Sequence, residues 1–195
     1  FHWGSKAGQG QEHVINERTG VGELHLVYYN YIYKNLSSAV SYNAATGLVV
    51  FSYILDVCKS DLDSIFGVYG SIIDQVKYYG STTVSYKIRL DAISNPCFSS
   101  NCKTYNQYYV YDGSLTTPEC NQIVTWFVSA NNLCISQTQL NKLRGTKDKV
   151  GSPLVNNYRN TQYLNCRTIH ITTSKSDLSE LQPPLSLSDE STLSV

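Results

Sequence analysis

Two histidines near the N-terminus are the residues in this sequence best suited to chemistry. His2 lies at the start of the chain, and His25 lies two residues after Glu23. The period of two around His25 predicts a strand that presents an imidazole and a carboxylate on one face, and three apolar residues on the other: Leu24, Leu26 and Tyr28. Two neighbouring strands that each present a histidine would suit one metal ion. However, a histidine on a strand is more often an ordinary core or surface residue, and two histidines fall short of the three protein ligands of a catalytic zinc.

Six short stretches give the pair of histidines a wider context. Three lie near the N-terminus and three further on, in this order: Phe1-His2-Trp3-Gly4, Gly10-Gln11-Glu12-His13, Glu23-Leu24-His25-Leu26-Val27-Tyr28-Tyr29-Asn30, Tyr111-Asp112-Gly113-Ser114-Leu115-Thr116-Thr117-Pro118, Val124-Thr125-Trp126 and Asn157-Tyr158-Arg159. In sequence and order they closely resemble the α-class carbonic anhydrases, zinc lyases that hydrate carbon dioxide, over about residues 1–170. The resemblance implies an α+β, mainly β fold, with a central, mostly antiparallel twisted sheet and short peripheral helices.

The resemblance assigns the metal site. His2 and His25 match two of the family's three zinc ligands, and the third would stand immediately before Phe1. We therefore expect the sequence to be a fragment without its N-terminal part, which in the family also carries the proton-shuttle histidine. Glu23 matches a carboxylate that orients a ligand histidine. His13 matches a histidine that supports this carboxylate and is not a ligand.

The resemblance also assigns the catalytic and pocket residues. Thr116 matches a hydroxyl that accepts a hydrogen bond from the nucleophile and donates its own proton to a carboxylate, here Glu12. Tyr111 matches a residue near His13, and Asn157 belongs to a segment that supports the site from behind. Taken alone, the stretch 114–118 is a turn and apolar strand positions are ordinary core. By resemblance, the carbon dioxide pocket has an apolar wall, with Thr117 at its mouth: Val27, Val50, Leu115, Val124 and Trp126.

Composition and compartment narrow the class of protein. The 195 residues are enough for one domain with a core, and sixteen tyrosines suit a β-rich protein. A formal charge of zero with 15% charged residues argues against nucleic acid or an anionic membrane as a partner, and no stretch is long enough to span a membrane. Six cysteines and the sequon Asn35-Leu36-Ser37 favour an oxidising compartment, so we expect a secreted, disulfide-bonded glycoprotein.

The cysteines are expected to form two disulfides. Cys97 and Cys102 enclose four polar loop residues, so a local bridge between them is sterically easy. The sheet of the resembled family would bring Cys58 near Cys134. Two thiols would stay unpaired: Cys120, whose matching partner in the family lies upstream, and Cys166, expected to be buried.

The remaining elements follow from hydrophobic periodicity. Strands are predicted at 23–30, 47–57, 108–111 and 123–129, and residues 35–46 read as a polar loop. Seven apolar residues between Leu62 and Val76 recur at helical spacing and predict one amphipathic helix. A shorter helix should run from Ser136 to Gly145, with Gln139 completing a capping box. The predicted domain covers residues 1–170, and the Ser- and Pro-containing segment 171–195 is expected to be disordered.

Three functions are compatible with this pattern. The first is zinc-dependent, reversible hydration of carbon dioxide to bicarbonate and a proton, with that small molecule as the substrate. The second is a catalytically silent carbonic-anhydrase-like domain that binds other molecules outside the cell. The third is a matrix or mineral-associated protein, for which the sequence contains no acidic or repetitive insert. A binding module has no physical need for His2, His25, Glu23, Glu12 and Thr116 together, so the enzyme is favoured.

Overall fold

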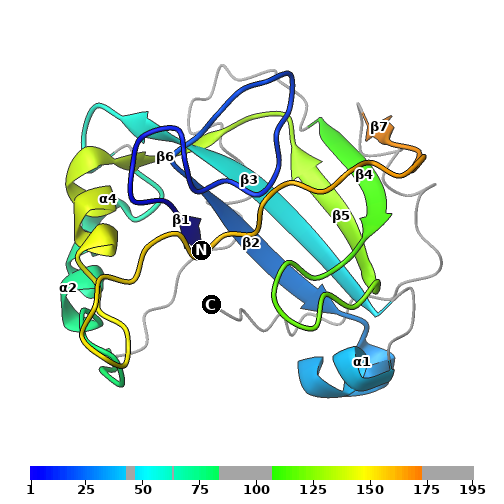
Figure 1. Cartoon of the computed structure of the whole chain (residues 1–195), viewed down its shortest axis with the longest axis horizontal. Helices are drawn as coiled ribbons and strands as arrows, with labels where there is room; N and C mark the ends of the chain where they lie inside the picture. Colours follow the sequence, from blue (N-terminus) through cyan, green and yellow to red (C-terminus); the bar gives the residue numbers. More distant parts are fainter. Residues whose placement is uncertain (43–46, 63, 84–106, 173–195) are drawn as a thin grey trace. The chain divides into compact units, whose positions relative to one another are not determined.

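A computed structural model describes residues 1–42, 47–62, 64–83 and 107–172 (Figure 1). Contacts between Cα atoms divide the chain into two compact units that are described separately. The first unit comprises Phe1–Glu23, Ile54–Cys102 and Asn132–Asn160, and the second comprises Leu24–Tyr53, Lys103–Asn131 and Thr161–Val195. In the part that the structure describes, every helix is too short or too polar to cross a membrane.

The second unit is built on neighbouring strands that Figure 1 shows side by side. They are the greater part of β2 (Gly22–Tyr29), the first half of β3 (Leu48–Cys58), β5 (Val124–Ser129), β4 (Tyr108–Gly113) and β7 (His170–Thr172). β3 runs parallel to β5, whereas β4 runs antiparallel to both β5 and β7. The end of β2 meets the start of β3, where the Asn30 N–H donates to the Gly47 carbonyl at 3.1 Å.

Aromatic side chains fill this unit around Phe51. Its ring stacks on Phe127 at 4.9 Å between centroids and meets Tyr28 and Tyr108 edge to face. Tyr53 is fully buried, and its hydroxyl lies 3.3 Å from that of Tyr108. Burial, with a smaller contribution from Tyr108, raises the pKa of Tyr53 far above its ordinary value. Tyr53 therefore stays neutral and behaves as part of the apolar core.

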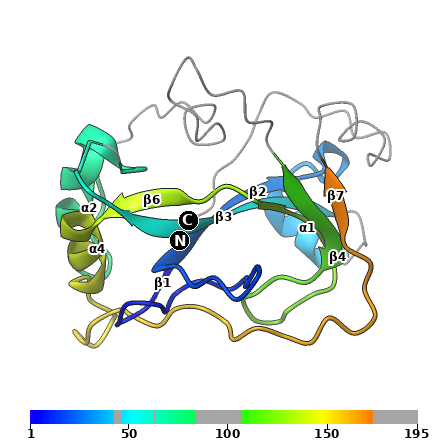
Figure 2. The ribbon, with the colours of Figure 1, turned by 90° about the horizontal axis from the view of Figure 1, so that it is seen from above.

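The first unit holds shorter ladders and two helices. β1 (His2–Trp3) runs antiparallel to the start of β2, and β6 (Leu133–Ser136) runs parallel to the end of β3. Helix α4 (Gln137–Arg144) follows β6 directly and lies beside α2 (Ile72–Gln75), as Figure 2 shows. The Ser136 side chain accepts from the Gln139 N–H at 3.1 Å, and Gly145 ends the helix, as predicted.

The sheet agrees with the fold expected from the sequence. Among the described residues, hydrogen bonds join seven strands in the order β1-β2-β3-β5-β4-β7, with β6 also paired to β3. Pairing directions are mixed and mostly antiparallel, and the helices are few and short. The prediction of a mainly β, α+β fold with a mostly antiparallel sheet is confirmed.

The predicted helix over 62–76 is wrong. Its place is taken by turns, the 3₁₀ helix η2 (Gly67–Ser71) and the single turn of α2. Gly67 has a φ of +46°, which α-helical residues do not adopt, and the Gln139 side chain lies where a Cβ on Gly70 would stand. The Gln139 amide donates to the Gly67 carbonyl at 3.1 Å, so it packs on η2 instead of completing a capping box.

The polar segment after β2 is also more ordered than predicted. It forms a 3₁₀ turn, η1 (Tyr31–Tyr33), before the loop predicted at 35–46, and the helix α1 (Leu36–Tyr42) takes the place of the described part of that loop. Asn35 begins α1, because its side-chain oxygen accepts from the Ser38 N–H at 2.8 Å. At the other end of the chain, Ile171 and Thr172 pair with β4, so the expected tail begins two residues too early. Residues 173–195 lie outside the described residues, and their disorder stays a prediction.

One predicted disulfide is present. Cys58, the last residue of β3, is bonded to Cys134, the second residue of β6, with Cα atoms 5.3 Å apart. Cys120 and Cys166 are free, but Cys166 is exposed, so its predicted burial is wrong. It lies in an exposed turn where Asn165 and Cys166 both have positive φ, and no apolar layer covers such a turn. The Cys97–Cys102 pair lies outside the described residues.

Removing the Cys58–Cys134 bridge should cost about 2–4 kcal/mol of unfolding free energy, because the bond closes a loop of 76 residues in the unfolded chain. Urea unfolding of Cys58→Ser, followed by circular dichroism, measures this loss. Cys120→Ser is the matched control, since that thiol is unpaired, and it should unfold like the parent chain. Equal stability of both variants would contradict a structural role for the bridge.

Candidate metal centre

The buried carboxylate of Glu23 organises the N-terminal loop. Glu23 lies on β2 with 0% exposure, and its Oε2 accepts from the backbone N–H groups of Glu12 at 2.6 Å and His13 at 2.8 Å. Its Oε1 lies 2.6 Å from Nδ1 of the His13 ring. Three donors from one short segment satisfy a carboxylate that would otherwise be costly to bury. The predicted support of Glu23 by His13 corresponds to this contact.

His2 is oriented by a residue from the far end of the chain. Its Nδ1 lies 2.9 Å from the Asn157 carbonyl and 3.4 Å from Oε1 of Glu12. A carbonyl oxygen can only accept, so the shorter contact assigns the ring hydrogen to Nδ1. The lone pair that suits a metal is then on Nε2.

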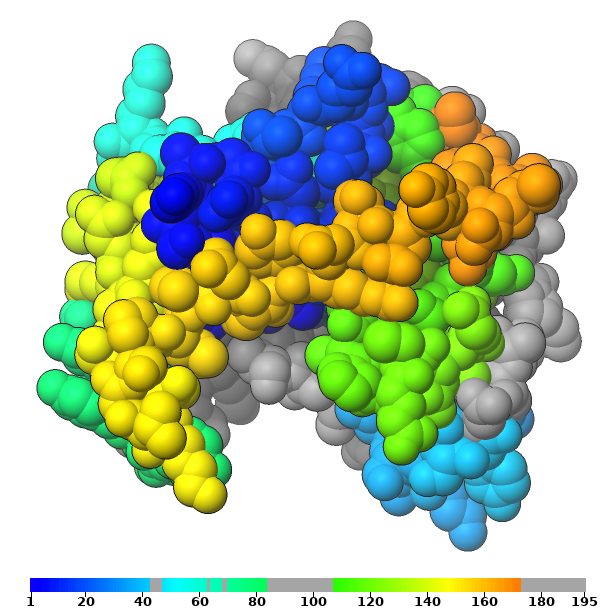
Figure 3. Space-filling model, viewed as in Figure 1, coloured from blue at the N-terminus to red at the C-terminus, as the bar shows by residue number. Residues whose placement is uncertain are grey.

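Asn157 also fixes the strand that carries His2. Its Oδ1 accepts from the Trp3 N–H at 2.7 Å, and its Nδ2 donates to the Phe1 carbonyl at 3.2 Å. The neighbouring Asn156 donates its N–H to the Trp3 carbonyl at 3.0 Å. In Figure 3 the segment around these asparagines (yellow to orange) lies against the N-terminal residues (dark blue). Segment 156–157 therefore acts as a clamp along β1.

Glu12 is held between these two supports. Its backbone N–H is bound by Glu23, and its Oε1 accepts from the Arg159 N–H at 2.6 Å. Because the residue is buried, the first contact holds its backbone and the second fixes the direction of its carboxylate. Gln11 closes the loop behind it, since its Oε1 accepts from the Gly20 N–H at 2.7 Å and its Nε2 donates to the Arg18 carbonyl.

His25 lies two residues beyond Glu23 on the same face of β2. It is buried, and its ring meets Trp126 edge to face at 4.8 Å between centroids. Trp126 is fixed in turn, because its indole N–H donates to the Ser114 carbonyl at 3.1 Å. A Cβ on Gly113 would stand 2.9 Å from the Tyr111 ring and 3.1 Å from Trp126, so only glycine allows this packing.

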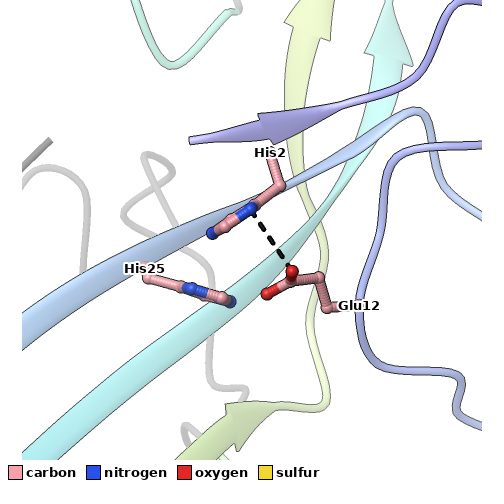
Figure 4. A group of neighbouring side chains, drawn as sticks. All are labelled: His2, Glu12 and His25. Atoms are coloured by element: carbon pink, nitrogen blue, oxygen red, sulfur yellow. Dashed lines mark ion pairs between the residues drawn. The ribbon is translucent and has the colours of Figure 1, made fainter. Parts of the chain in front are cut away.

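The register of β1 on β2 accounts for the candidate ligand set. His2 is directly opposite Glu23, and His25 follows on the same face of the strand. His2, Glu12 and His25, drawn in Figure 4, each offer one potential ligand atom, and within the first unit Nδ1 of His2 lies 3.4 Å from Oε1 of Glu12. The Glu23 carboxylate is already occupied by three donors. Imidazoles with a buried carboxylate are a donor set that suits zinc.

The remaining predicted residues lie on the sheet of the second unit and just after β4. Val50 is opposite Trp126 in the register of β3 and β5, and both are buried. Val124 is buried, Val27, Tyr111 and Leu115 are partly buried, Thr116 is half-buried, and Thr117 is exposed. The Leu115 N–H donates to the Asn121 carbonyl at 3.0 Å, which folds the segment back on itself. The Thr116–Glu12 pair, the place of Tyr111 near His13 and the apolar pocket wall stay predictions.

Sequence reasoning missed Gln11, Asn156 and the backbone carbonyl of Asn157. Asn156 has a φ of +58°, and asparagine is one of the residues that tolerates this region. The adjacent pair Asn156-Asn157 was therefore a usable signal for a sharp turn. A backbone carbonyl that orients a histidine 155 residues away leaves no trace in the local pattern.

Comparison with known proteins decides the family. A family model described as eukaryotic-type carbonic anhydrase matches residues 1–173. The chain belongs to this family. It is 31% identical to carbonic anhydrase 6 of Homo sapiens over 172 residues, covering 87% of this chain and 53% of that protein. It is 31% identical to carbonic anhydrase 7 of Homo sapiens over 176 residues, covering 87% and 61%.

One relative is named a carbonic anhydrase-related protein and not a carbonic anhydrase. The chain is 30% identical to the carbonic anhydrase-related protein of Rattus norvegicus over 183 residues, covering 87% of this chain and 58% of that protein. The first relatives are matched over 51% to 53% of their length, so the chain spans about half the length of the curated relatives it matches. The resemblance inferred from the sequence is confirmed at the level of the family.

Proposed function

We propose that this member of the carbonic anhydrase family catalyses zinc-dependent, reversible hydration of carbon dioxide. The observation that carries the proposal is the contact between Nδ1 of His2 and the Asn157 carbonyl, since it leaves Nε2 of His2 as the ring nitrogen available to a metal. Membership of the carbonic anhydrase family supports the reaction in general. The substrate is small and uncharged, which agrees with the apolar residues on β3 and β5.

Each residue of the proposed site has a physical task. His2 and His25 would hold zinc as neutral ligands, with Glu23 and Asn157 fixing the loop and strand around them. When bound, zinc supplies a hydroxide nucleophile near neutral pH, because in carbonic anhydrases it lowers the pKa of its water to about 7, a value established for that family and not obtained from this chain. Thr116 would orient the nucleophile by accepting its hydrogen and donating to Glu12. Val50, Val124 and Trp126 would keep water from the substrate.

Zinc binding tests the proposed ligands. We expect the 195-residue chain to bind zinc weakly through two imidazoles, and a chain extended by one histidine before Phe1 to bind about one zinc ion per chain. In the extended chain, His2→Ala and His25→Ala should each weaken zinc binding by more than about a hundredfold. Loss of a residue that only hydrogen-bonds a ligand costs up to about a hundredfold in metal affinity, and loss of the ligand itself should cost more. His170→Ala is the control, because His170 is exposed on β7. Calorimetric titration measures all five chains, and unchanged affinity in the ligand variants would refute the assignment.

Carbon dioxide hydration separates the two leading functions. A stopped-flow assay with a pH indicator should detect hydration by the zinc-loaded extended chain. The alternative is a catalytically silent extracellular binding domain, which the 30% identity to a carbonic anhydrase-related protein supports. An extended chain that folds but binds no zinc would support this second function.

We also propose that the protein is secreted. The Cys58–Cys134 bridge supports this location, because disulfides form and persist in oxidising compartments. Detection of the chain with both cysteines reduced inside the cytosol would contradict it.

A further inference from the structure

The sequon at the start of α1 is presented at the surface. Asn35-Leu36-Ser37 is the only Asn-X-Ser/Thr stretch in the sequence, and both Asn35 and Ser37 are exposed. The Oδ1 of Asn35 accepts from the Ser38 N–H at 2.8 Å, which settles which side of the amide faces the helix. The Nδ2 atom is therefore turned away from α1.

Apolar and aromatic residues flank this asparagine in the sequence. We define the tyrosine patch as Tyr31, Ile32, Tyr33 and Tyr42. Tyr31, Ile32 and Tyr42 are 48%, 58% and 72% exposed, and the Tyr33 and Tyr42 rings lie 5.4 Å apart on either side of Asn35 in the sequence. Lys34 is the only charged residue between positions 26 and 42. In Figure 3 the α1 segment (light blue) stands at the molecular surface.

An exposed patch of this kind needs a covering group of matching chemistry. Large apolar side chains gathered at the surface mark a place where something binds, since isolated ones are common but clusters are not. Tyrosine rings with one polar end suit a sugar, which offers an apolar C–H face and hydroxyl groups. The single sequon lies in the sequence between Tyr33 and Tyr42, whose rings meet, so its amide nitrogen is the point of attachment that we consider.

We propose that Asn35 carries an N-linked glycan whose first N-acetylglucosamine packs on the tyrosine patch. The donor is a lipid pyrophosphate-linked oligosaccharide. The Nδ2 atom of Asn35 forms a bond to C1 of the sugar and loses one proton, while the bond from C1 to the pyrophosphate oxygen breaks and the lipid pyrophosphate leaves with the electron pair. The proposal rests on the secretory location proposed above, because the donor and the transferase belong to that compartment.

Occupancy is tested by synthesising the chain behind a cleavable signal sequence in the presence of microsomes. Microsomes supply the compartment, so a failure of glycosylation is distinguishable from a failure of natural secretion. The parent chain and Ser37→Thr should show one mobility shift that a peptide N-glycan amidase removes. Ser37→Ala and Asn35→Asp should show none, although both keep an oxygen acceptor at the start of α1. The proposal is overturned if chains inside the microsomes form the Cys58–Cys134 bridge but yield an unmodified Asn35 peptide. The tyrosine patch would then be a binding surface for a protein partner.

Packing of the sugar is tested by thermal unfolding of the glycosylated chain. Trimming to a single N-acetylglucosamine should leave the melting temperature unchanged, whereas amidase treatment, which converts Asn35 to aspartate, should lower it by about 2–4 °C, the shift expected for loss of one modest contact in a chain of this size. The Asn35→Asp variant is chemically identical to the amidase product and should melt with it.

The tyrosine patch supplies the matched control. In Tyr33→Ser/Tyr42→Ser, amidase treatment should no longer shift the melting temperature, because the rings that receive the sugar are gone. Tyr163→Ser, which removes another exposed ring far along the sequence, should keep the full shift. An equal shift in both variants, or no shift in the parent chain, would overturn the packing of the sugar on the patch.

Discussion

Replacing Glu23 with alanine is expected to lower the unfolding free energy by about 3–5 kcal/mol, because several buried donors lose their acceptor at about 1–3 kcal/mol each. The side chain is 0% exposed, and its loss leaves the N–H groups of Glu12 and His13 and the His13 ring without their acceptor. These donors lie in one short loop, so the segment that positions Glu12 should loosen together with the strand.

Urea unfolding, followed by circular dichroism, measures the effect. Glu23→Gln keeps the shape and one acceptor oxygen and should lose less stability than Glu23→Ala. Glu17→Ala is the control, because Glu17 is an exposed carboxylate of the same loop. A Glu23→Ala chain as stable as the Glu17→Ala chain would show that the carboxylate does not organise the loop.

The second large effect concerns turnover. In a zinc-loaded, active form of the protein, Thr116→Ala should leave the zinc content unchanged and lower carbon dioxide hydration about a hundredfold, the scale of one lost preorganised contact in the transition state. The proposed reason is that Thr116 orients the nucleophile through its hydrogen bond to Glu12 and does not touch the metal.

Two measurements on the same sample distinguish a loss of turnover from a loss of zinc. Elemental analysis gives zinc per chain, and stopped-flow assays give the rate. Thr117→Ala is the neighbouring control, since Thr117 is exposed and is expected only at the pocket mouth. Loss of zinc in Thr116→Ala, or equal rates in the two variants, would show that Thr116 has a different role.

The sequence predicted most of what local patterns encode. The strand around His25 and the helix after Ser136 follow from alternation and capping, and the structure has both. The Cys58–Cys134 bridge followed from the resemblance, because only a known sheet brings together residues 76 positions apart. The same resemblance supplied His2 as a candidate ligand, which a two-residue strand could not have done alone.

The failures have physical causes in particular residues. The apolar stripe over 62–76 has helical spacing, but Gly67 and the packing of Gln139 against Gly70 select a 3₁₀ turn. Helix α1 was missed because Asn35 looked like a sequon in a loop, although one side-chain hydrogen bond makes it a helix cap. The burial of Cys166 could not be judged, since it depends on what covers the turn at 165–166 and not on its composition.

The contact between His2 and Asn157 also has a consequence for biosynthesis. His2 is translated before most of this chain, yet the carbonyl that orients its ring belongs to a residue 155 positions later in the sequence. A nascent chain that stops short of Asn157 can form the hairpin of β1 on β2, but not the correctly poised imidazole. The orientation of the His2 ring therefore depends on synthesis having passed Asn157. Side-chain substitution at position 157 leaves the carbonyl in the chain, whereas truncation before that position removes it.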